Sequence, residues 1–162
     1  MINVEHEDPI IRAYILFGQT TIVAKKYTDA YFYKKTGLSG IKFVVLQTLA
    51  SNKGTMTPSQ IAQWTYKERH NITTLVDRMS REGLVVAKRS SKDRRSVNIT
   101  LTDKGREVLN QARPVAREIV NQMMLSISEG DALQLEKLLV VLRQNAHYGL
   151  ERVYERSRPQ PE

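Results

Sequence analysis

Apolar residues recur every three or four positions along most of this chain, which is the spacing of amphipathic helices. The pattern predicts six helices, over about 9–35, 40–52, 58–65, 68–82, 103–126 and 129–155. Two runs of β-type residues, 84–89 and 97–101, separate the fourth helix from the fifth, and Thr55–Thr57 could form a third, very short strand. The expected fold is therefore mainly α with a small β-hairpin.

The predicted helix boundaries carry recognisable capping residues. The expected N-caps are Asp8, Ser39, Thr57, Thr102 and Ser128. Thr57 and Gln60 have the spacing of a capping box, and Gly37 and Gly83 are placed to end two helices. Pro114 lies inside the fifth helix, where we expect a kink or an interruption near 110–114.

Composition narrows the classes of protein to consider. The chain has 162 residues, no cysteine and a formal net charge of +8. The absence of cysteine excludes disulfides and thiolate chemistry. Because no apolar run approaches the roughly 18 residues of a membrane span, we expect a cytoplasmic protein with no membrane partner. Eleven Lys and Arg against five Asp and Glu lie between 67 and 106, which predicts a polyanionic partner; an ordinary solvated face is the alternative.

A short helix joined tightly to an amphipathic helix and then to a basic hairpin is the arrangement of a winged helix-turn-helix. The second helix of that motif enters the major groove of double-stranded DNA. The candidates for base contact on helix 68–82 are Arg69, His70, Asn71 and Thr74. The candidates for backbone contact are Thr57, Ser59, Gln60, Thr73 and Arg78. A surface helix with arbitrary polar residues is the alternative interpretation.

The hairpin tip is rich in cations. Its candidate wing residues are Lys88, Arg89, Lys92, Asp93, Arg94 and Arg95. Such a tip can follow a phosphate backbone or place an arginine in a narrow minor groove. Asp93 is interpreted as an orienting partner for Arg94 or Arg95, and a salt-bridged turn without DNA is the alternative.

Two segments resemble the MarR family of transcriptional regulators. The run from Asp93 to Gly105, with D-x-R followed by L-T and a glycine, resembles the family's wing, and 71–85 is similar to its recognition helix. The resemblance implies a homodimeric regulator, expected to be a repressor, that binds a pseudo-palindromic operator. It also implies that a small ligand can release the DNA, as in many relatives.

The terminal helices are expected to form the dimer. The predicted organisation is an N-terminal dimerisation helix (1–36), a winged helix-turn-helix lobe (37–106), C-terminal dimerisation helices (107–156) and a disordered tail (157–162). The candidate interface residues are Ile10, Ile11, Tyr14, Ile15, Leu142, Ala146, Leu150 and Val153. The alternative is that these stripes pack only within one chain.

Six aromatic residues could line an effector pocket, although such residues more often form plain core. They are Phe17, Tyr27, Tyr31, Phe32, Phe43 and Trp64. The three histidines are dispersed, and neither a phosphate-binding loop nor a catalytic motif is found, so no metal, no cofactor and no enzymatic activity is expected. Two other functions stay open: a sequence-neutral architectural DNA-binding protein, and a helical protein-interaction module that uses the basic hairpin.

Overall fold

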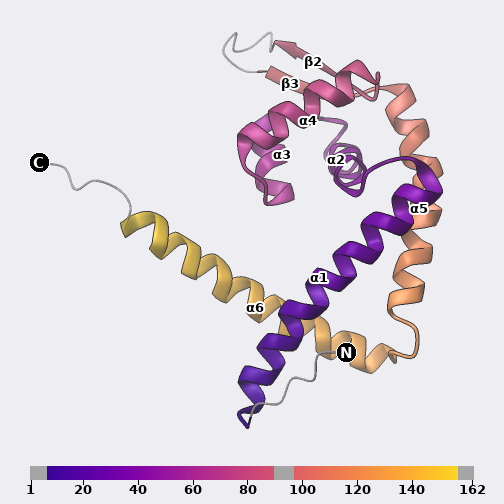
Figure 1. Ribbon diagram of the computed structural model, residues 1–162. Helices are drawn as coiled ribbons and strands as arrows, with labels where there is room; N and C mark the ends of the chain where they lie inside the picture. The colour runs from indigo at the N-terminus through magenta and orange to yellow at the C-terminus, as the bar shows by residue number, and fades with distance from the viewer. Residues whose placement is uncertain (1–6, 90–96, 157–162) are drawn as a thin grey trace, which may run out of the picture. The chain divides into compact units, whose positions relative to one another are not determined.

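The computed structural model describes residues 7–89 and 97–156, the last three by their backbone alone (Figure 1). The elements are α1 (Pro9–Thr36), α2 (Gly40–Ser51), β1 (Thr55–Met56), α3 (Pro58–Thr65), α4 (Arg69–Arg81), β2 (Val85–Arg89), β3 (Val97–Leu101), α5 (Asp103–Met123) and α6 (Glu129–Arg156). Two compact units result, Met1–Met123 and Met124–Glu162. None of the helices described is both long and apolar enough to cross a membrane.

The three strands form one antiparallel sheet in the order β1-β3-β2. β2 pairs with β3 from Val85 opposite Leu101 to Arg89 opposite Val97. β1 adds two residues on the other side of β3, with Met56 opposite Ile99. The hairpin and the very short third strand are thus confirmed.

One apolar core holds the first unit together. Its most deeply buried side chains come from every helix of that unit and from the sheet: Phe32, Leu46, Leu49, Ile61, Ile72, Met79, Ile99 and Leu109. α1 packs along α5, and α2 lies between α3 and α5. The core therefore fixes which face of each helix points to solvent.

Most of the predicted caps are confirmed. The Asp8 side chain accepts from the Ile10 N–H at 2.7 Å, and Thr57 and Gln60 form a complete capping box. Thr102 accepts from the Gly105 N–H at 2.9 Å, and Ser128 accepts from the Asp131 N–H at 3.1 Å. Ser39 is a correction: it occupies the N-cap position of α2, but only its backbone carbonyl bonds into the helix.

Of the kink or interruption expected near 110–114, the interruption is wrong, because α5 continues without a break from Asp103 to Met123. Leu109 and Ala112 before the proline and Ile119 after it are all buried in the core. Packing on both sides therefore holds the helix across the position where proline removes a backbone hydrogen bond. α5 ends three residues earlier than predicted, and Ser126 in the following turn has a positive φ of 67°.

The base of the hairpin is closed by residues at the start of α5. The Thr102 hydroxyl lies 2.7 Å from the carbonyl oxygen of Gly83 and 2.9 Å from that of Leu84. A Cβ on Gly105 would lie 2.1 Å from the same Leu84 carbonyl oxygen, so only glycine allows this approach. α4, the hairpin and α5 therefore meet at one tightly packed point.

Candidate nucleic-acid interface

α4 presents a polar face to solvent because its apolar stripe is buried. Ile72, Val76 and Met79 are 1%, 3% and 0% exposed. All four candidates for base contact are exposed along the rest of the helix: Arg69, His70, Asn71 and Thr74. The structure therefore leaves all four side chains accessible to solvent around the start of α4.

The candidates for backbone contact lie in two different settings. Ser59, Gln60, Thr73 and Arg78 are exposed, whereas Thr57 is half-buried. Thr57 and Gln60 already bond to each other, since the Thr57 N–H donates to the Gln60 Oε1 at 2.8 Å. Capping the start of α3 is therefore the observed role of these two side chains.

A groove of about 440 Å³ joins the start of α3 to α4 and the hairpin. Thr57 and Ser59 line it from the start of α3, and Arg69 and Thr73 line it from α4. Ala87 and Val97 contribute the wall from the hairpin. Three elements that are separate in the sequence therefore border one groove of mixed polar and apolar lining.

The wing candidates are only partly described. Lys88 and Arg89 are exposed at the outer end of β2. Lys92, Asp93, Arg94 and Arg95 lie outside the described residues. The two described cations continue the positive charge of α4 along the hairpin.

The turn that leads into α4 has a residue that sequence reasoning missed. Tyr66 adopts the left-handed conformation, with φ 52° and ψ 41°, and its side chain is 68% exposed. The conformation costs about 1–2 kcal/mol for a residue other than glycine. Its backbone N–H and that of Lys67 both bond to the carbonyl of Ala62, which closes the end of α3. No sequence signal marks a tyrosine for this position.

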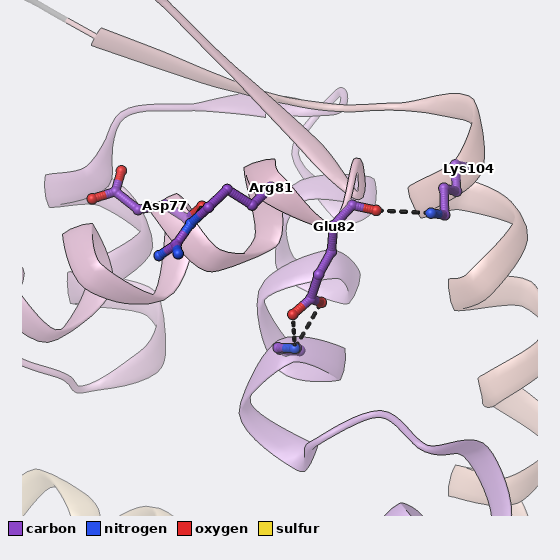
Figure 2. Close-up of polar contacts among 5 residues, drawn as sticks. Asp77, Arg81, Glu82 and Lys104 are labelled. Atoms are coloured by element: carbon purple, nitrogen blue, oxygen red, sulfur yellow. Dashed lines mark hydrogen bonds and ion pairs between the residues drawn. The ribbon is translucent and has the colours of Figure 1, made fainter.

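The other end of α4 is held by charged side chains (Figure 2). The Glu82 carboxylate accepts from the Lys42 Nζ of α2 at 2.6 and 2.7 Å. The Lys104 Nζ of α5 donates to the backbone carbonyl of Glu82 at 2.8 Å. Arg81 turns back along its own helix and donates from Nε to the Asp77 carbonyl at 3.3 Å. The end of α4 is therefore tied to both α2 and α5.

A cavity of about 860 Å³ lies in the first unit, walled by α1, α2, α4 and α5. Its apolar wall includes Phe32 and Phe43, whose ring centroids are 4.9 Å apart. Its polar wall includes Asn71, Thr74 and Arg78 of α4. The cavity thus shares three side chains with the exposed surface of α4.

Phe32 and Phe43 line this cavity, whereas the other four aromatic residues predicted for an effector pocket lie outside it. Tyr27 and Tyr31 pack against the core beside α5, and the Tyr31 hydroxyl donates to Glu118 Oε1 at 2.7 Å. Phe17 and Trp64 are 38% and 60% exposed. Tyr27 and Tyr31 lie one helical turn apart and face the polar side of α5, which explains why they miss the cavity.

Comparison with known proteins identifies the family. The profile of the MarR family matches residues 36–96, from the end of α1 to the residue before β3. The HTH-type transcriptional regulator YkoM of Bacillus subtilis is 31% identical over 106 residues, which cover 65% of this chain and 68% of YkoM. The chain belongs to the MarR family.

Other MarR-family proteins extend the comparison. The transcriptional repressor MprA of Escherichia coli K12 is 28% identical over 106 residues, or 65% of this chain and 60% of the length of MprA. Sco3205 of Streptomyces coelicolor, a MarR-family regulator solved in complex with DNA, has the same fold, with a TM-score of 0.76 at 19% identity over 88% of this chain and 92% of that one. Members of the MarR family are transcriptional regulators and not enzymes.

The candidate dimer residues of this MarR-family chain are largely solvent-exposed. On α1, Ile10, Ile11 and Tyr14 are 77%, 40% and 70% exposed, and Ile15 is half-buried. On α6, Leu142, Leu150 and Val153 are 39%, 52% and 60% exposed, and Ala146 is exposed. Among the described residues, no group of three or more His, Asp or Glu side chains could hold a metal ion.

Proposed function

We propose that this chain is a homodimeric transcriptional regulator that recognises a specific sequence of double-stranded DNA. The observation that carries the proposal is the exposed face of α4, where Arg69, His70, Asn71 and Thr74 surround the start of the helix. Arginine pairs with guanine and asparagine with adenine through two hydrogen bonds each. The DNA complex of Sco3205 supports this use of the shared fold.

The kinds of side chain on α4 favour sequence reading over purely electrostatic binding. An architectural protein that ignores sequence would need mainly Lys and Arg on this surface. Instead, α4 mixes one amide and short hydroxyls with its cations. We infer that residues 37–106 form the DNA-binding lobe, with α4 in the major groove and Ser59, Thr73 and Arg78 near phosphates.

The hairpin is proposed to act as the wing. Lys88 and Arg89 are exposed on β2, and the sequence places Lys92, Arg94 and Arg95 beyond them. These cations would contact the minor groove or the phosphate backbone, where positive charge releases counterions. Asp93 would orient one of the neighbouring arginines.

A single recognition helix contacts too few base pairs to be selective, so we propose that two chains act together as a dimer. Two recognition helices about 34–36 Å apart read two half-sites on one face of DNA, so a pseudo-palindromic operator is expected. We propose that 1–36 and 107–156 supply the dimer interface, because α1 and α6 expose large apolar side chains that water does not favour. The repressor MprA supports repression as the outcome.

The test is selection of bound fragments from random DNA, followed by footprinting. The expected result is one preferred site whose protected region has two-fold symmetry. Equal binding to every duplex would support the architectural alternative, and no binding to DNA would support the protein-interaction alternative.

Substitution of the base candidates sharpens that test. Arg69→Ala or Asn71→Ala should weaken operator binding by about 1–3 kcal/mol and relax the preference at one position of each half-site. The matched control is Gln111→Ala, an exposed polar residue of α5. Equal effects on operator and scrambled duplexes would contradict base reading.

Substitutions in the wing should weaken binding to every duplex, whatever its sequence. Arg94→Ala combined with Arg95→Ala should weaken binding to operator and scrambled DNA together and reduce the salt slope by about 1 for each phosphate that the protein no longer neutralises. Lys26→Ala with Lys34→Ala removes the same charge from exposed positions of α1 and serves as the control. Unchanged affinity at moderate salt would contradict the wing assignment.

A small-molecule effector is a second proposed property, favoured by the cavity of about 860 Å³. That volume lies within the range of about 300–1,000 Å³ typical of ligand pockets. Its apolar wall with cationic Lys67 and Arg78 suits an amphipathic molecule. Anilinonaphthalene sulfonate is a suitable fluorescent probe, and operator DNA should displace it because Asn71, Thr74 and Arg78 border both sites.

A further inference from the structure

Glu82 places a negative charge where it is unfavourable on two grounds. It is the C-cap residue of α4, and the C-terminal end of a helix carries partial negative charge that favours cations. It also lies in the segment 67–106, which is strongly basic and is proposed above to bind a polyanion. A neutral residue would serve both the helix and the attraction to DNA better, so the carboxylate needs another explanation.

The contacts of Glu82 provide one. Its carboxylate meets the Lys42 Nζ through both oxygens, at 2.6 and 2.7 Å, and Lys42 stands in the first turn of α2. The Lys42 side chain is 20% exposed, and the Glu82 side chain is 45% exposed. The backbone carbonyl of Glu82 accepts from Lys104 of α5 (Figure 2). One residue therefore ties the end of α4 to the helices on either side.

The two ends of α4 are held differently. The N-cap residue Glu68 makes no capping bond with its side chain, and Arg69, His70 and Asn71 are exposed. The thirteen residues of α4 span about 20 Å, so a tilt at the C-terminal end is carried to these candidates for base contact. A tilt of about 5° would move the far end by roughly 2 Å, more than the distance range of a hydrogen bond allows.

We propose that Lys42 and Glu82 are a positioning pair that sets the orientation of α4 relative to α2, and through it the sequence specificity of the lobe. The proposal rests on the proposed role of α4 in DNA recognition. Neither residue needs to touch DNA, because both act through the position of Arg69 and Asn71. A partly exposed ion pair contributes little to stability, so the pair can be removed without unfolding the chain.

The experiment compares affinity for the selected operator with affinity for a scrambled duplex at one salt concentration, using the full chain. Loss of a negative charge alone would tighten binding to both duplexes. We expect Glu82→Gln to lower the ratio of operator to scrambled affinity about two- to fivefold, the range that a partly exposed ion pair can supply, and Lys42→Met to do the same. Glu107→Gln removes an equal charge from an exposed position at the start of α5, which is not among the candidate DNA-contact or dimer residues, and should leave the ratio unchanged.

The reversed pair, Lys42→Glu with Glu82→Lys, decides between positioning and charge. Restoration of the operator preference, with melting temperatures near that of the parent chain, supports the proposal, and it does so even where a single variant fails to fold. An unchanged ratio in both single variants overturns it, as does a folded reversed pair that lacks the preference. If the parent chain itself shows no preference for an operator, the proposed function fails instead.

Discussion

Helices α4 and α6 carry apolar side chains at the same spacing, yet one stripe is buried and the other is exposed. Ile72, Val76 and Met79 of α4 are at most 3% exposed, whereas Leu142 and Leu150 of α6 are 39% and 52% exposed. The periodicity of a sequence shows that a helix has an apolar face. It does not show whether that face is covered by the same chain.

The largest expected effect tests the buried stripe of α4. Met79→Ala should lower the free energy of unfolding by about 2–5 kcal/mol, because it leaves a cavity at a fully buried position. Urea denaturation at fixed protein concentration measures the change. Leu133→Ala on α6, where the side chain is 53% exposed and lies away from the candidate dimer stripe, is the comparison and should cost less. Equal losses would contradict the difference between the two helices.

The next effect addresses α6 and the proposed dimer. Leu142→Asp combined with Leu150→Asp should weaken association at least about tenfold, because an interface would have to bury two carboxylates. Light scattering should then give the 18.6 kDa of one chain in place of twice that mass.

The control for the dimer is Gln134→Asp with Gln144→Asp, which adds the same charge at exposed polar positions of α6. That variant should keep the mass of the parent protein. A parent protein that already scatters as a single chain would contradict the dimer.

The smallest expected effect concerns the backbone strain at Tyr66, which has a positive φ of 52° in the turn before α4. Tyr66→Gly should raise the free energy of unfolding by about 0.5 kcal/mol, since glycine adopts positive φ without strain but has more freedom in the unfolded chain. Lys53→Gly tests the same exchange at another position with positive φ, 58°. Thermal denaturation measures both, and a less stable Tyr66→Gly would show that contacts of the tyrosine outweigh its backbone strain.

Local signals made most of the fold predictable. Helix starts at Asp8, Thr57 and Thr102 were marked by capping residues whose hydrogen bonds the structure contains. The alternation of Val97, Ile99 and Leu101 likewise marked β3. The exposed face of α4 followed from its buried stripe, because a helix has only one register once that stripe is fixed.

Features that depend on distant residues were not predictable. Lys42 and Glu82 are 40 positions apart, and no sequence signal connects them. Tyr31 of α1 lies outside the cavity and bonds to Glu118 of α5, 87 residues away along the chain. Continuity of α5 through Pro114 depends on burial on both sides, which the proline itself does not signal.

Thr102 fixes the base of the hairpin, so that changes between β2 and β3 need not disturb the rest of the fold. Its hydroxyl lies within hydrogen-bond distance of the carbonyl oxygens of Gly83 and Leu84, and Val85 pairs with Leu101 in the adjacent register position. The base of the hairpin is therefore held by hydrogen bonds. Lengthening the chain between β2 and β3 would cost only about 0.6 kcal/mol for each doubling of the loop. The segment between β2 and β3 can therefore change in length at little cost to the stability of the domain.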